Sequence, residues 1–268
     1  MEIVEFNERL DVADALNNIV HGDCLDVMKA LPDKSIDVII TSPPYNLRNS
    51  TGNGLKYKGD IGIWTHFALQ DGYDGHNDDM PYDEYVDWQR RCLAEMTRIV
   101  KDDGAVFYNN KNRVQDGLIQ DRGEIVKGFP LRQIITWKRK GSVNFNDGFY
   151  LPITEQIYLI CRKPFKLAKG ANHFTDVWEI AQEQKNPHPA PFPEELVERV
   201  LQSTTGKIIL DPFGGSGTTG VVAKKHGRDF ILIEQSQKYC ELAKARIEGI
   251  TGWREGQRKE SPNLFMFL

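Results

Sequence analysis

Two short motifs carry the residue types that could do chemistry in this sequence. The first, TSPPY at residues 41–45, follows the apolar run 36–40 and presents polar acceptors beside an aromatic ring. The second, DPFGGSGTT at residues 211–219, follows the run 207–210, and its glycines let the backbone approach a ligand closely. Each has the form of a buried parallel strand that ends in a turn. Open α/β sheets bind their ligands at such turns, so both are candidate binding segments.

An acidic residue follows the glycine loop at a suitable distance. Glu234 ends the next predicted strand, roughly 20 residues after the glycines, and a carboxylate in that position can bind both ribose hydroxyls of an adenosine. The loop lacks the GxGxxG pattern of dinucleotide-binding proteins, and no Walker lysine follows it, so a phosphate cradle is disfavoured. An ordinary tight turn would not need the Asp-Pro start, the three glycines, the threonines and Glu234 together.

Together, the motifs resemble those of DNA methyltransferases that use S-adenosylmethionine and act on the amino group of a base. The catalytic motif comes first and the glycine loop last, which is similar to the order in the permuted β class of that family. The resemblance implies that part of the loop faces the methionine end of the cofactor and that Glu234 binds its ribose. The loop residues concerned are Asp211, Phe213, Gly214 and Gly215.

Two further segments match the same family, so the resemblance extends from residue 21 to residue 247. The sequence HGDC at 21–24 resembles a turn whose carboxylate accepts a hydrogen bond from the adenine amino group of the cofactor, a role that falls to Asp23. The sequence HPAPFP at 188–193 resembles a segment that lines the methionine end, which makes His188 a cofactor-binding candidate.

The catalytic turn suits the reaction that the resemblance implies. The amino group of a base is a poor nucleophile because its lone pair is delocalised into the ring. The side-chain oxygen of Ser42 and the carbonyl of Pro43 would accept its hydrogens and direct the lone pair at the methyl carbon. Pro43 and Pro44 make the turn rigid before the substrate arrives. Tyr45 offers a face on which an extruded base can stack, worth about 1–3 kcal/mol.

The target base stays open between adenine N6 and cytosine N4. In the family, serine before Pro-Pro is more usual in cytosine enzymes, whereas an asparagine after the tyrosine, here Asn46, is often seen in adenine enzymes. The C5-cytosine enzymes are excluded, because they need a cysteine nucleophile after a proline and no cysteine of this chain follows a proline.

The elements that position these residues alternate along the chain. This alternation predicts an α/β fold with a doubly wound, mostly parallel sheet, in one catalytic domain at 1–268. Strands at 131–137 and 155–161 are expected to form an antiparallel hairpin. The other expected strands are 18–23, 35–40, 105–108, 207–210 and 230–234, and the expected helices are 26–31, 82–100, 193–201, 220–226 and 236–247.

The composition of the chain limits the classes of protein to which it can belong. The chain has 268 residues, 40% of them hydrophobic, and can bury a large core. No apolar run approaches the roughly 20 residues that span a bilayer, and the acidic start is unlike a signal peptide. The four cysteines, at 24, 92, 161 and 240, are too far apart for a metal-binding cluster. We expect a cytoplasmic protein with reduced thiols, no metal site and no membrane segment.

One region is basic although the net charge of −4 gives no general support for nucleic-acid binding. Residues 127–169 hold nine lysines and arginines against two acidic residues, with aromatic residues between them. A solvated basic face has a similar composition, but the aromatic residues suit a groove that meets a phosphate backbone. The recognition region is therefore expected at 138–170, after a core-facing Trp137. Its candidate contacts are Lys138, Arg139, Lys140 and Asn144.

A polar, glycine-rich segment at 46–80 has the composition of either a partly disordered loop or a binding flap, and a flap near the DNA is favoured. Its candidate contacts are Arg48, Lys56 and Lys58. The rest of the chain leaves no room for a large recognition domain, which suggests a homodimer whose two copies share double-stranded DNA.

Other functions compete with this hypothesis. An RNA or protein-amide methyltransferase could use a similar Pro-Pro-Tyr turn, but such enzymes typically place the glycine loop before it. A module that binds DNA or cofactor without catalysis is a second alternative, although the acceptor, the aromatic ring and the ribose carboxylate are all present. A nicotinamide dehydrogenase is disfavoured because the loop lacks GxGxxG.

Overall fold

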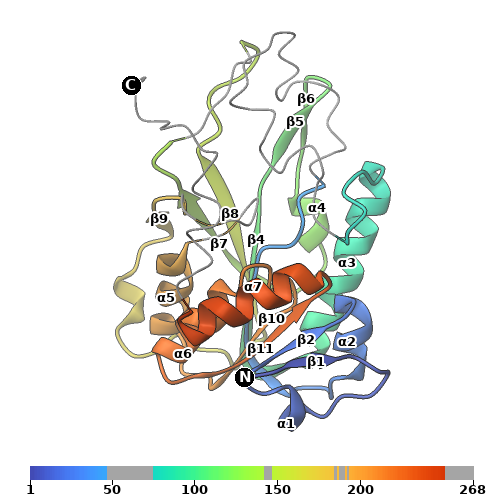
Figure 1. Ribbon diagram of the computed structural model, residues 1–268. Coiled ribbons are helices and arrows are strands. Elements are labelled where there is room, and N and C mark those ends of the chain that lie inside the picture. The colour runs from blue at the N-terminus through green and yellow to red at the C-terminus, as the bar shows by residue number, and fades with distance from the viewer. Residues whose placement is uncertain (47–74, 142–146, 184–185, 187–190, 192, 251–268) are drawn as a thin grey trace.

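A nine-stranded sheet forms the centre of the molecule (Figure 1). The computed structural model describes residues 1–46, 75–141, 147–183, 186, 191 and 193–250. Across the sheet the strands lie in the order β1 (Ile3–Glu5), β2 (Asn18–His21), β11 (Asp229–Glu234), β10 (Ile208–Asp211), β3 (Ile36–Thr41), β4 (Val100–Asn110), β8 (Thr154–Ile160), β7 (Leu131–Lys138) and β9 (Val177–Glu179). Neighbours are parallel except where β8 lies between β4 and β7. The predicted doubly wound, mostly parallel sheet with an antiparallel hairpin is confirmed.

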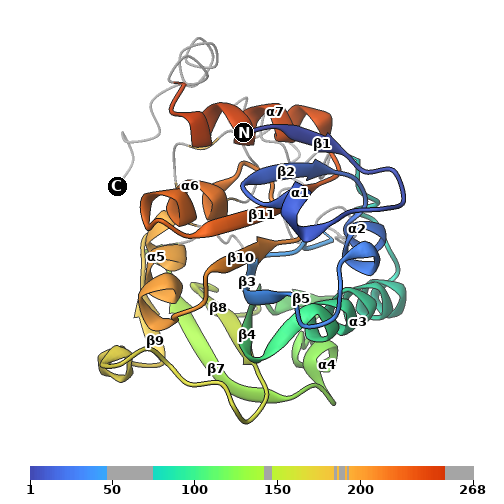
Figure 2. The same cartoon turned by 90° about the horizontal axis from the view of Figure 1, so that it is seen from below.

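Helices cover both faces of the sheet (Figure 2). One face packs against α5 (Glu194–Ser203), α6 (Thr218–Lys225) and α7 (Gln237–Glu248), and the other against α1 (Val12–Ala15), α2 (Cys24–Ala30), α3 (Tyr82–Ile99) and α4 (Gly123–Val126). Side chains alternate between the two cores, so that Ile209 of β10 belongs to the first and Leu210 to the second. Because both faces are covered, the central strands are largely apolar, which is why they show in the sequence as short apolar runs.

Several short elements were not predicted from the sequence. The strands β5 (Arg113–Gln115) and β6 (Leu118–Gln120) form a separate hairpin, and η1 (Ala171–His173) is a single 3₁₀ turn. These elements, like α1, α4, β1 and β9, have only three or four residues, too few to show a period. In the part of the chain that the structure describes, no helix has the length and apolar character needed to cross a bilayer.

The side chain of Asp37 connects β3 to both of its neighbours, β10 and β4. These contacts lie at the opposite end of the strands from the two motifs. Its Oδ2 accepts hydrogen bonds from the backbone nitrogens of Lys207 (3.1 Å) and Ile208 (2.8 Å), while its Oδ1 pairs with Lys101 Nζ at 2.7 Å. Burial opposes ionisation, but these donors outweigh it and lower the pKa of Asp37. The carboxylate thus fixes the strands that carry both motifs relative to each other.

Candidate active site

The carboxyl ends of the parallel strands lie at one edge of the sheet, where both motifs are found. The turn at 42–45 follows β3, and the glycine loop follows β10. β10 lies between β11 and β3, and the chain passes from β10 to β11 through α6 on one face and from β3 to β4 through α3 on the other. Such a switch point leaves a crevice outside the strand ends, where doubly wound sheets bind ligands.

A cavity opens at this edge, and both motifs line it. It encloses about 540 Å³ of empty space, its open mouth included. Ser42 and Pro44 contribute from the first motif, and Phe213 and Gly215 contribute from the second. Two turns that lie 170 residues apart in the sequence therefore form one site.

The glycine loop is fixed to the end of β11. The backbone nitrogen of Gly214 donates to the carbonyl of Ile233 at 2.8 Å, and that of Gly215 donates to Glu234 Oε2 at 2.7 Å. Glu234 Oε1 accepts from the backbone nitrogen of Ser236 at 2.8 Å. Gly217, the residue directly before α6, has a φ of +79°, and a Cβ there would lie 2.8 Å from Ala243 Cβ. The loop can therefore keep this close path only with a glycine at that point.

Asp211 connects the two motifs. Its buried carboxylate accepts hydrogen bonds from Thr41 Oγ1 at 2.8 Å, Thr219 Oγ1 at 2.7 Å and the backbone nitrogen of Phe213 at 3.1 Å. Burial raises the pKa of Asp211 to about 7, against the effect of these donors. Both oxygens thus bind protein groups, and Asp211 shapes the loop between the end of β3 and the start of α6.

Asp23 caps the helix that begins beside the cavity. Its Oδ1 accepts hydrogen bonds from the backbone nitrogens of Leu25 (2.8 Å) and Asp26 (3.2 Å), which is the usual role of an N-cap aspartate. Its neighbours on either side, Gly22 and Cys24, line the cavity. Asp23, which the HGDC segment singled out, therefore lies beside the cavity and also caps α2.

Aromatic rings form one wall of the cavity. Trp88 of α3 packs edge-on against Phe213 with ring centroids 5.8 Å apart, and His76 lies over Trp88 at 4.6 Å. His76 Nε2 is buried without a hydrogen-bond partner among the described residues, and burial lowers the pKa of His76 to about 4. No sequence pattern pointed to His76, and Trp88 was not singled out within the helix predicted at 82–100.

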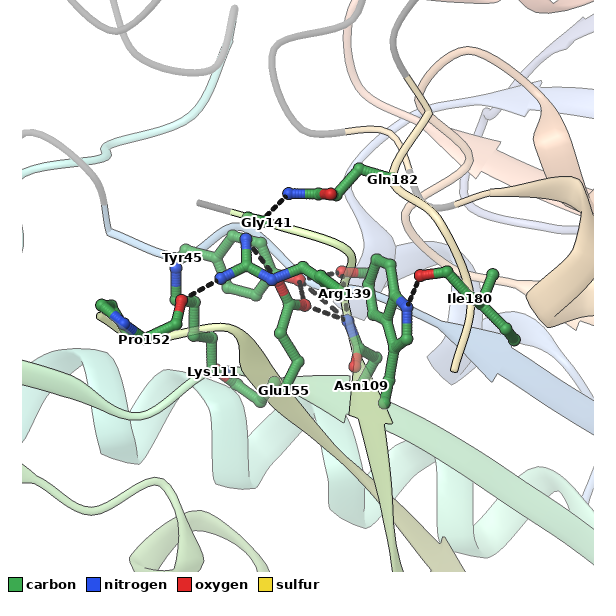
Figure 3. Close-up of polar contacts among 12 residues, drawn as sticks. Tyr45, Asn109, Lys111, Arg139, Gly141, Pro152, Glu155, Ile180 and Gln182 are labelled. Carbon is green, nitrogen blue, oxygen red and sulfur yellow. Dashed lines mark hydrogen bonds and ion pairs between the residues drawn. The ribbon is translucent and has the colours of Figure 1, made fainter. Parts of the chain in front are cut away.

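The catalytic turn is held in a polar network (Figure 3). Ser42 Oγ and the hydroxyl of Tyr45 are 2.6 Å apart, and that hydroxyl donates to Glu155 Oε2 at 3.1 Å. Asn109 Nδ2 donates to the same Oε2 and to the Tyr45 hydroxyl, both at 2.9 Å. On the other side of the turn, the Pro44 carbonyl accepts from the hydroxyl of Tyr85 at 3.0 Å. The turn is therefore fixed from both sides before a substrate binds.

Glu155 and Arg139 form a buried ion pair beside this turn (Figure 3). Arg139 Nη1 lies 3.6 Å from Glu155 Oε1, with only 10% and 7% of the two side chains exposed, and Arg139 Nη2 donates to the Pro152 carbonyl at 2.5 Å. Neither residue was predicted as part of the catalytic site. The signal lies in the register, because Trp137 pairs with Glu155 across β7 and β8. Arg139, two residues after the core-facing Trp137, has its side chain on the same face.

A model of the N6/N4 methyltransferase family, described as DNA methylase, matches residues 36–245, which include the catalytic turn and the glycine loop. The chain belongs to this family. The predicted family and enzyme class, an amino-group DNA methylase, are thereby confirmed.

Two curated relatives support the assignment. The Type II methyltransferase M.HinfI of Haemophilus influenzae is 29% identical over 266 residues, which cover 90% of this chain and 70% of the relative. The Type II methyltransferase M2.MboI of Moraxella bovis is 30% identical over 255 residues, covering 87% and 88%.

Solved structures show the same fold. The cytosine-N4-specific PvuII DNA methyltransferase matches with a TM-score of 0.67 and 19% identity over 85% of each chain. A DNA modification methylase of Thermus thermophilus, complexed with S-adenosyl-L-methionine, matches with a TM-score of 0.61 and 22% identity over 87% of this chain and 93% of that one.

The methylase does not present its three consecutive basic residues as one surface. Trp137 is buried, as predicted, and Arg139 is turned inward to Glu155. The prediction that Arg139 contacts DNA phosphates needs correction, because its guanidinium already binds protein groups in a buried place. Lys138 points elsewhere, with 44% of its side chain exposed and an ion pair to Glu179 at 2.8 Å, and Lys140 is exposed.

Asn46 is the first residue of the segment 46–80, which is the predicted flap of the methylase. Its Oδ1 accepts from the backbone nitrogen of Met80 at 2.8 Å, and its Nδ2 donates to the Met80 carbonyl at 2.7 Å. The side chain thus joins the two ends of the segment 46–80. Because a structural role explains this asparagine, its presence after the tyrosine does not by itself favour adenine.

Five candidate residues lie outside the described residues. They are Arg48, Lys56, Lys58, Asn144 and His188.

Proposed function

We propose that this methylase transfers a methyl group from S-adenosylmethionine to the exocyclic amino group of an adenine or cytosine that is extruded from double-stranded DNA. The observation that carries the proposal is the single cavity lined by Ser42 and Pro44 on one side and by Phe213, Gly215 and Glu234 on the other. A catalytic turn and a cofactor loop must meet in this way if a methyl group is to pass between them.

The residues around the cavity suit the cofactor, which supplies an electrophilic methyl group when bound. Glu234 lines the cavity, and its carboxylate, fixed by the backbone N–H groups of Gly215 and Ser236, is an acceptor suited to ribose hydroxyls. Trp88 and Phe213 offer apolar faces to an adenine ring. The buried Nε2 of His76 gives a further polar group to the same cavity. We assign the adenine amino group to Asp23, beside the lining residues Gly22 and Cys24.

The catalytic turn acts on the target base. Ser42 Oγ and the Pro43 carbonyl accept the amino hydrogens, so that the nitrogen lone pair points into the cavity as the nitrogen becomes tetrahedral. The ring of Tyr45 stacks on the extruded base. Pro44, fixed by Tyr85, keeps these acceptors in place before the base arrives.

Labelled methyl transfer tests the proposal. The protein is incubated with tritiated S-adenosylmethionine and with DNA, RNA or protein in separate reactions. We expect label in DNA alone, and its loss in Ser42→Ala and Tyr45→Ala with cofactor binding by calorimetry retained. Transfer that persists in both variants would show that the catalytic site lies elsewhere.

The two relatives are Type II methyltransferases, and we extend to this chain a site-specific modification of DNA. A homodimer that shares the DNA and a cytoplasmic location remain predictions. Sedimentation with and without a DNA duplex measures the number of copies bound.

A further inference from the structure

We propose that Glu155 is the final acceptor of a proton relay that runs from the target amino group through Ser42 and Tyr45. The proposal rests on the proposed function, because it needs the base to bind at Ser42. It adds a base on β8, a strand that neither sequence motif contains.

The hydrogen bonds have a defined direction. A carboxylate can only accept, so Tyr45 uses its one hydroxyl proton to donate to Glu155 Oε2 at 3.1 Å. In the 2.6 Å contact between Ser42 and Tyr45, the proton must then come from Ser42. Ser42 Oγ accepts a hydrogen bond from Asn109 Nδ2 at 3.3 Å and keeps its second lone pair for an amino hydrogen of the base. The chain of donors thus leads from the substrate position toward the carboxylate.

The relay residues lie on one face of the sheet at its carboxyl edge. Ser42, Asn109 and Glu155 lie two residues away from Ile40, Phe107 and Ile157, which all belong to the core that packs against α5, α6 and α7. Side chains two residues apart in a strand share a face. The polar cluster therefore continues this core toward the strand ends, next to the cavity that Ser42 lines.

The surroundings keep Glu155 ready to accept a proton. Only 7% of its side chain is exposed, and a buried carboxylate is tolerated when it is paired and hydrogen-bonded. Arg139 supplies the charge at Oε1 from the end of β7, and Asn109 Nδ2 donates to Oε2 from β4. Lys111, after β4, is a second cation near Glu155, and burial together with Arg139 lowers the pKa of Lys111.

Atoms and electrons balance in the proposed step. The amino nitrogen forms the new N–C bond with its lone pair as the methyl carbon leaves the cofactor sulfur, which keeps the bonding electrons. The nitrogen then carries a positive charge and two hydrogens. One of these moves to Ser42 Oγ while the Ser42 proton moves to Tyr45 and the Tyr45 proton moves to Glu155. The products are a neutral N-methylamino base and a carboxylic acid, which returns its proton to solvent after product release.

Two variants break the relay at different points. Glu155→Gln keeps an oxygen that accepts from Tyr45 but cannot take up a proton, and Tyr45→Phe keeps the stacking ring but removes the hydroxyl. Glu195→Gln is the matched control, since Glu195 pairs with Arg199 at 3.2 Å on the exposed side of α5, away from the cavity. Single-turnover methyl transfer to DNA is measured across pH for each protein, with cofactor affinity by calorimetry and stability by thermal melting.

We expect the rate constant to fall about 100-fold or more in both relay variants, as is typical for loss of a general base. Cofactor affinity and melting should change little, and Glu195→Gln should match the wild type. Any fall in the wild-type rate at acid pH should be absent in Glu155→Gln, because the variant has no carboxylate at this position.

Rates within threefold of the wild type in both relay variants, or a slow Glu155→Gln that keeps the acid fall, would overturn the relay. If Glu155→Gln melts early or loses cofactor, Tyr45→Phe decides alone. A Ser42→Ala variant that stays active would instead overturn the proposed function. An inactive Ser42→Ala beside active relay variants would overturn the relay only.

Discussion

Asp211 is the residue through which the two motifs contact each other. Its carboxylate binds Thr41, which directly precedes the catalytic turn, and Thr219, which lies in the first turn of α6. A buried carboxyl with a pKa of about 7 holds its proton over much of the acid range, whereas the same group in the unfolded chain releases it near 3.8. Proton binding at Asp211 is therefore coupled to folding.

The sign of this coupling gives a prediction. Because the pKa of Asp211 is raised in the folded protein, its contribution to stability is fully present at low pH and is lost as pH rises through about 7. Asp211→Asn, which does not titrate, should lack this loss, so that its stability relative to the wild type rises by about 2–3 kcal/mol between pH 5 and pH 8. Urea unfolding at the two pH values measures it. Equal pH dependence in the two proteins would contradict the prediction.

At His76 the coupling between proton binding and folding stability has the opposite sign. Its pKa falls from 6.5 to about 4 in the folded protein, so acid favours the unfolded chain, which takes up the proton first. The wild type should lose about 1–2 kcal/mol more than His76→Phe between pH 7 and pH 5, since phenylalanine keeps a ring against Trp88 and does not titrate. Thermal melting of both proteins at these pH values checks it, and parallel losses would show that His76 titrates normally.

Single residues differ in how well the sequence predicts them. Ser42 and Glu234 follow or end apolar strands and line the same cavity, and their place at the strand ends could be located because the end of a parallel strand shows in its sequence. Glu155 and Arg139 join the site through the pairing of β7 with β8 and of β8 with β4. Local sequence patterns do not define how two strands joined by a long loop align with each other. The sequence therefore indicated only that residues 127–169 are basic.

Among the elements, β3 and β10 must stay in register for the two turns to meet. Asp37 fixes them at the far edge, and Gly206 and Gly104 leave room for it. A Cβ at Gly206 would lie 2.4 Å from Asp37 Cβ, and one at Gly104 would lie 2.4 Å from the Asp37 carbonyl oxygen. Real Cβ atoms do not approach so closely, and the strands would have to move apart.

Substitution of these glycines tests the packing. Gly206→Ala should destabilise the protein by about 2 kcal/mol or more, because the new methyl group has no space beside Asp37. Gly141→Ala is the control, since a Cβ there meets nothing within 4 Å, and it should change stability by no more than about 0.5 kcal/mol. Urea unfolding compares them, and similar values would mean that the strands yield easily.

The longer elements were predictable, whereas most of the shortest ones were not. Helix α3 begins directly after Pro81, and Ser236 caps α7 through the backbone nitrogen of Tyr239 at 3.4 Å. The sequence predicts a strand only at 105–108, whereas β4 already starts at Val100, before Gly104. There the close approach of Asp37 requires the glycine, and a contact between distant segments cannot be predicted from local patterns.

At the scale of the whole molecule, a net charge of −4 leaves DNA binding to local basic surfaces. The exposed ion pair between Lys138 and Glu179 is of a kind that contributes little to stability, so Lys138 can exchange it for a phosphate. Arg139, one residue later, forms an ion pair with Glu155. Neighbouring basic residues should therefore have separable effects.

Salt-dependent DNA binding separates them. The double variant Lys138→Ala/Lys140→Ala should make the slope of log K against log salt shallower by roughly 0.9 for each phosphate that is no longer neutralised. Arg139→Ala should leave the slope unchanged and reduce methyl transfer instead, because its side chain pairs with Glu155. Fluorescence anisotropy with a DNA duplex measures the slopes. An unchanged slope in the double variant would direct the search for the DNA path to Arg48, Lys56 and Lys58.

The most direct test of the account identifies the atom that receives the methyl group. DNA is incubated with the protein and with S-adenosylmethionine that carries a deuterated methyl group, then digested to nucleosides and analysed by mass spectrometry. We predict deuterated N6-methyladenine or N4-methylcytosine, one of the two, and none with Ser42→Ala. Label on C5 of cytosine, or DNA without label while the protein binds the cofactor, would contradict the proposed use of the cavity between the catalytic turn and the glycine loop.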